Sequence, residues 1–176
     1  MAVASERLYH VSEESGITTF EPRPSPSYFS KIQGDVVFAI NERLLHNYLL
    51  PRDCPRVTYY CGPSTTQLDQ ELFFQGHADY VIAIETAWLK RVSRTTLYCY
   101  EFDASNFLCI DECAGYYVSY CTERPLTVQC IDSPLQTIAE RGDVQLIILP
   151  SIRELATSVA RSSLQYSFIR MRNIKN

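Results

Sequence analysis

The sequence predicts an α+β fold: a mixed, mostly antiparallel sheet, or two packed sheets, with short helices at the periphery. Two observations carry this prediction. Four strand-like segments follow one another closely between residues 96 and 131, and their side chains alternate in part between polar and apolar, as in an antiparallel meander. The segments with helical spacing are few and short, which argues against a doubly wound parallel sheet.

The first third of the chain is expected to hold three strands and one helix. Asn41 is a suitable N-cap for a helix that follows the second strand and that Pro51 ends. The strands are predicted at residues 6–12, 36–40 and 57–61.

Residues 13–35, between the first two strands, are rich in Ser, Pro and Gly. Proline fixes φ and removes a backbone donor, so this segment, and Pro22 to Pro26 above all, is expected to be an extended loop. We expect this loop to lie as a flap over the first strand.

The rest of the chain is expected to contain further strands and three short helices. Ser133 and Pro134 are expected to open one helix, and the spacing of Ser151 and Glu154 is that of a capping box for another. Helices are predicted at residues 66–75, 134–141 and 151–161, and strands at 79–85, 96–103, 107–111, 116–120, 126–131 and 144–149, with a weaker edge strand at 166–171.

Length and charge limit the classes of protein that fit. The 176 residues suggest a single globular domain, 1–176, with one sizeable core. A net charge of −4 argues against general nucleic-acid binding, because a phosphate footprint requires a basic surface. No run of about 18 apolar residues is present, so we expect no membrane partner.

The cysteines indicate a reducing compartment. Their number is odd, seven, and most lie within strand-like segments. The N-terminus lacks the basic and apolar regions of a secretory signal, so a cytoplasmic protein with reduced cysteines is expected. Cys109 and Cys113 form a close pair, but no histidine or second pair with zinc-like spacing accompanies them, so we expect no metal site.

The first candidate site is His10 on the first strand. Alternation places His10 and Ser12 on the same face, where an imidazole beside a hydroxyl can bind a ribose or a phosphate. The alternative is a structural histidine of the core or surface.

A second candidate is the corner from Phe38 to Tyr48. Backbone N–H groups at the start of a helix favour anionic ligands, and Tyr48 lies where its ring can stack on a flat base. The alternative assigns Tyr48 to the apolar face of the helix, beside Leu44 and Leu45.

The third candidate is the loop from Arg52 to Arg56, which prolines bracket. Arginines in a rigid loop can bind a phosphate or a carboxylate, with Asp53 orienting them. A local salt bridge that fixes the loop is an equally good interpretation.

The fourth candidate is the strand that contains Tyr116 and Tyr117, whose side chains must point to opposite faces. Acidic residues flank it, Glu123 among them, and a carboxylate here can stabilise the oxocarbenium-like centre of glycosyl transfer. The alternative is an exposed charge on a hairpin.

Several segments of the chain resemble a family of small uncharacterised bacterial proteins. The most specific is Pro51-Arg52-Asp53-Cys54-Pro55-Arg56-Val57-Thr58. Others are Leu8-Tyr9-His10-Val11-Ser12, Phe38-Ala39-Ile40, Ala83-Ile84-Glu85 with Trp88-Leu89, residues 97–103, Gly115-Tyr116-Tyr117-Val118, Pro125-Leu126 and Arg170-Met171-Arg172-Asn173. This resemblance covers nearly the whole chain and implies no activity.

A looser resemblance is to ADP-ribosyltransferase-like folds. It implies that His10 and Ser12 contact the ribose of NAD, and that the corner from Phe38 to Tyr48 supplies an aromatic ring to stack on nicotinamide. It also implies a late catalytic glutamate. Tyr116 occupies the place expected for that residue, and Glu123 lies in a flanking turn.

Three functions follow as hypotheses. The leading one is a cleft that binds NAD or a related nucleotide, with glycosyl transfer as its chemistry. There His10 and Glu123 are the catalytic residues, and the cofactor-binding residues are Ser12, Phe38, Tyr48, Arg52 and Tyr117. The second is a non-enzymatic interaction module that keeps the fold, and the third is a small hydrolase or nuclease that uses His10.

Overall fold

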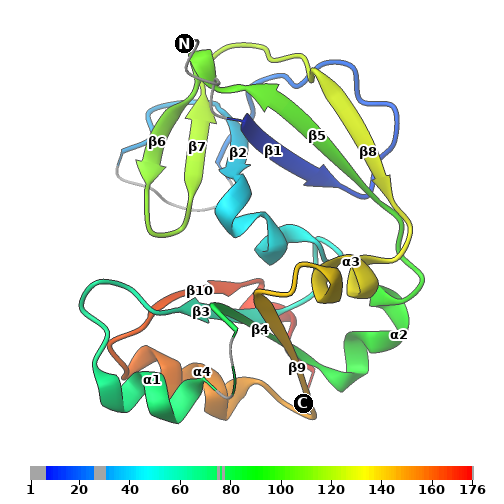
Figure 1. The fold of residues 1–176 in the computed structure, drawn as a ribbon. Helices are drawn as coiled ribbons and strands as arrows, with labels where there is room; N and C mark the ends of the chain where they lie inside the picture. Colours follow the sequence, from blue (N-terminus) through cyan, green and yellow to red (C-terminus); the bar gives the residue numbers. More distant parts are fainter. Residues whose placement is uncertain (1–6, 26–30, 75, 77, 176) are drawn as a thin grey trace. The chain divides into compact units, whose positions relative to one another are not determined.

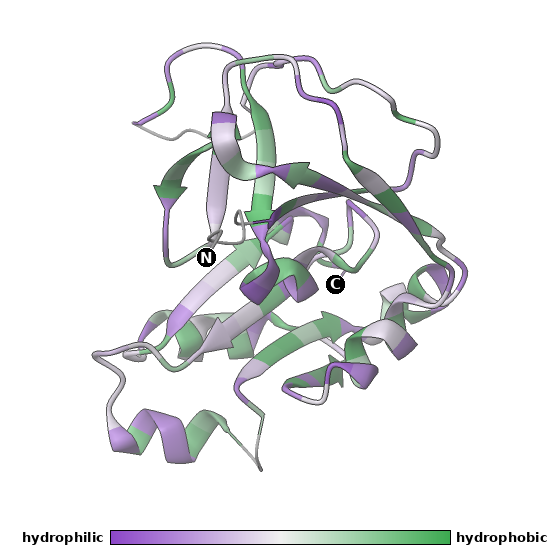
Figure 2. Cartoon of the chain, turned by 45° about the horizontal axis from the view of Figure 1, so that its top comes forward, coloured by the Kyte–Doolittle hydropathy of each residue, from purple (hydrophilic) through white to green (hydrophobic). Residues whose placement is uncertain are grey.

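The computed structural model describes residues 7–25, 31–74, 76 and 78–175. The chain divides into two compact units, each with its own sheet (Figure 1). The first unit consists of residues 1–48 and 97–131, and the second of residues 49–96 and 132–176. Figure 2 shows that hydrophobic residues concentrate in the strands and hydrophilic ones in the connecting loops.

The sheet of the first unit is antiparallel throughout and has the strand order β6-β7-β2-β1-β5-β8. Its central strand β1 pairs with β5 along its whole length, from Arg7 opposite Asp103 to Ser12 opposite Tyr98. The strands are β1 (Arg7–Ser12), β2 (Val37–Asn41), β5 (Leu97–Asp103), β6 (Leu108–Asp111), β7 (Tyr116–Ser119) and β8 (Thr127–Ile131).

The helix expected after β2 is a 3-10 helix, η1 (Glu42–Tyr48). Asn41 caps it as predicted, since its Oδ1 accepts a hydrogen bond from the backbone N–H of Leu44 at 3.2 Å. The same oxygen explains a glycine nearby. Gly115 has a φ of +66°, and a Cβ added there would lie 2.6 Å from Oδ1 of Asn41. A second 3-10 turn, η3 (Ala104–Asn106), joins β5 to β6.

The core of the first unit lies mainly on one face of this sheet. Its buried side chains come from four strands or their flanks and from the loop after β1: Leu8, Phe20, Val37, Ala39, Tyr100, Phe102 and Phe107. A smaller cluster of Val36, Ile110 and Val118 forms separately. The alternation of Leu8, His10 and Ser12 along β1 therefore places all three on the face that carries the larger cluster.

The second unit contains a four-stranded mixed sheet of order β10-β3-β4-β9. Only the β4–β9 pair is parallel among its three pairs. The inner strand β4 is a nearly continuous apolar run and is buried over most of its length, as is usual for parallel strands, whereas the edge strand β9 is apolar but mostly half-buried. The strands are β3 (Arg56–Tyr60), β4 (Tyr80–Glu85), β9 (Val144–Leu149) and β10 (Gln165–Ile169).

Short helices complete the second unit. They are α1 (Gln67–Phe73), η2 (Thr86–Trp88), α2 (Leu89–Val92), α3 (Pro134–Glu140), α4 (Arg153–Ala160) and η4 (Met171–Asn173). Helix α4 buries Ala156 and Val159 against Val57, Tyr59, Val81 and Ala83 of β3 and β4. Apolar burial on this scale stabilises the unit by about 1.5–3 kcal/mol for each large side chain.

The capping predictions are confirmed only in part. Pro134 opens α3 as expected, but the Ser133 side chain makes no capping hydrogen bond. Helix α4 begins at Arg153, two residues after the proposed cap, because Ile152 adopts the N-cap position. The hydroxyl of Ser151 accepts from the backbone N–H of Arg153 at 3.4 Å instead.

The predicted fold class is confirmed at the level of an α+β protein with mostly antiparallel sheets and a few short helices. The weak strand expected near the C-terminus exists as the edge strand β10. Pro26, the last proline of the expected loop, lies outside the described residues. Within the part of the chain that the structure describes, no helix combines the length and the apolar character that crossing a membrane requires.

Candidate functional site

His10 lies on β1 in a defined orientation. Its Nδ1 is 2.9 Å from the backbone carbonyl oxygen of Phe38 on the neighbouring strand β2. A carbonyl oxygen only accepts, so Nδ1 carries the proton and donates. In the neutral imidazole, Nε2 is consequently the acceptor nitrogen. This hydrogen bond thus orients the ring of the half-buried His10 and sets the tautomer of its neutral form.

The loop after β1 crosses over His10 as the expected flap. The ring of Phe20 lies 4.9 Å from the imidazole of His10, centroid to centroid, and 5.2 Å from the ring of Tyr100. The Tyr100 hydroxyl holds the loop: it donates to the carbonyl of Glu14 at 2.7 Å and accepts from the N–H of Ile17 at 3.2 Å. Phe20 is therefore a fixed cover on one side of the histidine.

Glu123 supplies a buried carboxylate to the same face of the sheet. Its Oε1 accepts a hydrogen bond from the Ser119 hydroxyl at 2.5 Å, and the residue is only 7 % exposed. Its backbone forms a two-way bridge with Phe20, with hydrogen bonds of 2.8 and 2.9 Å. The interpretation of Glu123 as an exposed hairpin charge is therefore wrong, because Ser119 and Phe20 draw this turn inward.

Tyr117 shares the face of His10. It lies opposite Ala39 in the β2–β7 pair and packs against the core cluster that contains Leu8 and Phe20. Its ring is half-buried, so it combines a fixed position with access to solvent. His10, Tyr117 and Glu123 are thus brought to one face by three different segments of the first unit.

Ser12 is on this face too, but its hydroxyl has a local role. Its Oγ accepts a hydrogen bond from the N–H of Glu14 at 3.0 Å, which shapes the turn that leaves β1. That turn starts the flap, so Ser12 contributes to the position of Phe20.

Phe38 and Tyr48 belong to the opposite side of the sheet. Phe38 contributes its carbonyl to His10 while its ring packs with the Val36–Ile110–Val118 cluster. The Tyr48 hydroxyl donates to the hydroxyl of Tyr116 at 2.6 Å, and Tyr116 alternates with Tyr117 along β7. The structure therefore does not bring the rings of Phe38 and Tyr48 to the face that carries Tyr117.

Arg52 lies in the second compact unit, in the exposed turn before β3. The other arginine of this loop, Arg56, is fully buried at the start of β3, and its Nη1 donates to the carbonyl of Pro51 at 3.4 Å. Asn173 closes the loop by donating to the carbonyl of Asp53 at 2.7 Å. Burial raises the pKa of the Cys54 thiol to about 11, so it is a poor nucleophile.

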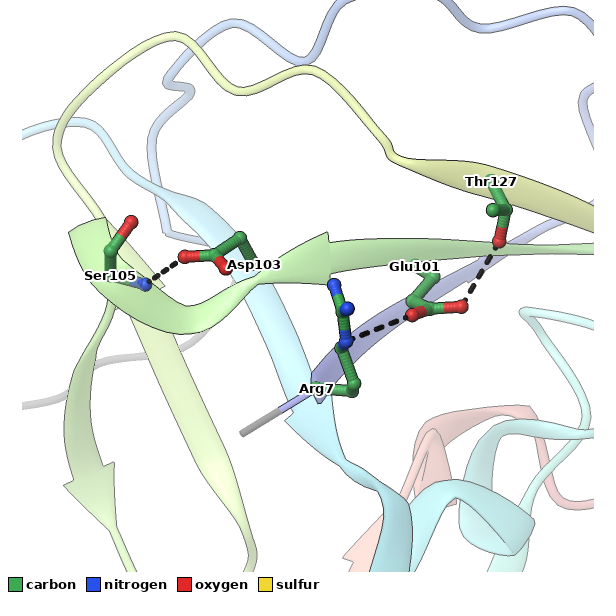
Figure 3. A network of polar contacts seen from close by, with 5 residues as sticks. All are labelled: Arg7, Glu101, Asp103, Ser105 and Thr127. Carbon is green, nitrogen blue, oxygen red and sulfur yellow. Dashed lines mark hydrogen bonds and ion pairs between the residues drawn. The ribbon is translucent and has the colours of Figure 1, made fainter. Parts of the chain in front are cut away.

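The opposite face of the first sheet carries a polar network (Figure 3). Arg7 pairs with Glu101 across β1 and β5, with 3.3 Å from Nε to Oε1, and Glu101 accepts from the Thr127 hydroxyl at 3.0 Å. Burial, aided by the charges of Glu42 and Glu101, raises the pKa of Tyr9 above its usual value. Among the described residues, no group of three or more His, Cys, Asp or Glu side chains is arranged to hold a metal ion.

Sequence reasoning missed Phe20, Tyr100 and Ser119. Phe20 is an isolated aromatic in a polar loop, which is a usable signal for a segment that folds back onto a core. Tyr100 could have been placed by alternation, since it lies directly opposite His10 in the β1–β5 pair. Ser119 carries no such signal, because its bond to Glu123 depends on the turn that follows β7.

A comparison with protein-family models gives one match, over residues 9–174, to a family of unknown function, DUF6886. The chain belongs to this family. The DUF6886 match includes residues from both compact units, among them His10 and Glu123. No curated protein and no solved structure matches the chain.

Proposed function

We propose that this DUF6886 protein binds NAD or a related nucleotide at the face of the first sheet that carries His10. The observation that supports this most is the hydrogen bond from Nδ1 of His10 to the carbonyl of Phe38. It makes Nε2 the acceptor of the neutral ring, which suits a ribose hydroxyl as the donor.

The neighbouring side chains suit the other parts of such a ligand. Tyr117 offers a half-buried ring on the same face, and aromatic rings stack well on a base or on nicotinamide. The Ser12 hydroxyl stabilises the turn that begins the flap, and the ring of Phe20 packs beside His10 and borders the site there. The rings of Phe38 and Tyr48 lie on the opposite side of the sheet, so the proposal gives them no contact with the ligand.

Glycosyl transfer is the chemistry we propose for the site, with Glu123 as its carboxylate. The C–N bond between ribose and nicotinamide breaks, and nicotinamide leaves with the bonding electron pair. The acceptor hydroxyl attacks the ribose carbon, a C–O bond forms, and the proton of the acceptor hydroxyl passes to solvent water. A buried carboxylate held by Ser119 suits the stabilisation of the positive charge on the ribose as it develops.

The setting that we propose is the cytoplasm of a bacterium. All seven cysteines are free of disulfide bonds, which fits a reducing compartment. Two measurements check this setting. The thiols of the purified protein should be reduced, and the protein should fold when it is expressed in the cytosol, without export by a secretory host.

The test is isothermal titration of the folded full chain with NAD, with ADP-ribose and with a 2′-phosphorylated oligonucleotide. We expect heat for at least one of them, and a loss of about tenfold or more in affinity for His10→Ala. Ser105→Ala, in an exposed turn of the same unit, is the matched control and should bind as the parent does. The absence of heat from all three ligands with the folded protein would overturn the proposal.

A second candidate function is an interaction module without catalysis. Phe20 favours it, because its ring already packs on His10 and its backbone is bridged to Glu123. If the flap already covers this face of the sheet, the face is filled by the chain's own side chains and does not require a small ligand. This candidate is supported if no nucleotide binds to either the parent or a Phe20→Ala variant.

A further inference from the structure

We propose that the outer edge of β10 is the interface between two copies of this chain. β10 is the last strand of the four-stranded sheet, hydrogen-bonded to β3 on one side (Figure 1). An edge strand presents a row of backbone donors and acceptors to any strand that pairs with it, and natural proteins usually protect such edges with charge, proline or a bulge. Gln165-Tyr166-Ser167-Phe168-Ile169 has no charge and no proline, and its pairing with β3 is regular over all five residues.

The side chains of β10 add an exposed aromatic patch to this edge. Tyr166 is 43 % exposed and Phe168 is 37 % exposed, and their rings stack 4.6 Å apart at an angle of 26°. Large aromatic side chains left on a surface in this way are typical of protein interfaces. Their i, i+2 spacing places both rings on one face of the strand.

A second copy is the occupant that matches this pattern. If two β10 strands pair antiparallel about a two-fold axis at Ser167, Tyr166 of one copy lies opposite Phe168 of the other, and the reverse. Both aromatic residues then make cross-strand aromatic pairs on one face, and such pairs stabilise sheets. Gln165 lies opposite Ile169 in the same register, so no like charges meet.

The other sheet edges fit a second copy less well. β6 has a register irregularity between Cys109 and Asp111 and ends on a carboxylate, both of which discourage pairing. β9 exposes one large side chain, Ile148, at 40 %. β8 exposes Val128 but no aromatic residue. The choice of β10 therefore rests on its paired aromatic residues rather than on edge position alone.

The experiment is sedimentation velocity on the full chain from about 10 to 500 µM, the range in which a small interface associates. A reductant is present throughout, because five cysteines are exposed and could otherwise link copies. We expect a monomer–dimer equilibrium. Thermal unfolding of each variant named below shows whether that variant is folded.

The register is tested at Ser167, which faces itself across the proposed axis. Ser167→Lys or Ser167→Glu alone places like charges opposite each other, so each should weaken dimerisation by about tenfold or more. An equal mixture of the two variants should restore it, because lysine then faces glutamate. Ile148→Lys, at an exposed position on the other edge of the same sheet, should leave dimerisation unchanged.

Four outcomes overturn the proposal: a monomer at every concentration, a dimer that both Ser167 variants keep, loss of the dimer in Ile148→Lys, or a Lys and Glu mixture that stays monomeric. A Tyr166→Ala, Phe168→Ala double variant tests the aromatic pairs without adding charge and should also weaken the dimer. The measurement is of mass, so its result does not depend on whether the first unit binds a nucleotide.

Discussion

His10 and Phe38 are joined by a hydrogen bond from Nδ1 of the imidazole to the backbone carbonyl oxygen, 2.9 Å long, between neighbouring strands of the first sheet. The bond orients the ring, and it also satisfies a partly buried carbonyl. A structural and a ligand-binding role of His10 are therefore compatible, and they can be separated by the choice of substitution.

We predict that His10→Ala lowers the free energy of unfolding by about 1 kcal/mol, because the Phe38 carbonyl loses its side-chain donor. His10→Asn should retain most of the stability, since an amide N–H₂ can take the place of Nδ1–H. Urea unfolding of the three proteins measures both effects. Equal losses in the two variants would show that the hydrogen bond contributes nothing to stability.

The Ser119–Glu123 contact predicts coupled effects on stability. The Ser119 hydroxyl donates to Glu123 and also accepts from the N–H of Cys121 at 3.1 Å, so Ser119→Ala should cost about 1–3 kcal/mol. Glu123→Gln should cost less when Ser119 is already alanine. A double-mutant cycle in urea should give a coupling energy of about 1 kcal/mol, and additive losses would argue against the contact.

The parts of the fold that the sequence predicts well are those with strong local patterns. Residues 79–85 and 144–149 are apolar runs that match β4 and β9, and Asn41 caps η1 as expected. The parallel pairing of β4 with β9 is not local, since about sixty residues separate them, so no periodicity reveals it.

The site shows the same division between local and non-local information. Alternation along β1 correctly groups His10 with Ser12, because the period of a strand is a local property. The burial of Glu123 depends on a bridge to Phe20, about one hundred residues earlier in the chain. A polar turn residue is ordinarily exposed, and only this long-range pairing overrides that expectation.

Removal of the Phe20 ring should expose His10. Phe20→Ala leaves a cavity beside His10, Tyr100 and Phe102, and we expect a loss of about 3 kcal/mol in the free energy of unfolding. The imidazole should then react faster with diethylpyrocarbonate. His46, which is 1 % exposed, is the internal control and should stay protected. Phe20→Leu should react at nearly the parent rate, and an unchanged rate in Phe20→Ala would mean that the ring does not shield His10.

Thiol reactivity should separate the buried from the exposed cysteines. Burial raises the pKa of Cys54 from its ordinary 9.0 to about 11 and that of Cys99 to about 12. The thiolate is the reactive form, so neither should react with an aromatic disulfide at pH 8 while the protein is folded. The exposed Cys109, Cys113, Cys121 and Cys130 should react quickly, and mass spectrometry of the products identifies each site.

The same two thiols predict a loss of stability in alkali. A group whose pKa is raised on folding binds its proton more tightly in the native state, so its contribution to stability is complete below the unfolded pKa of about 9 and is lost as the pH rises through the folded value. The free energy of unfolding should therefore fall between pH 9 and about 11 for Cys54, and further toward 12 for Cys99. Cys54→Ala and Cys99→Ala, compared at pH 8 and pH 10.5, should each show a shallower decline than the parent. Cys130→Ala, at an exposed position, should keep the parent slope, and the same slope in all four proteins would contradict this assignment.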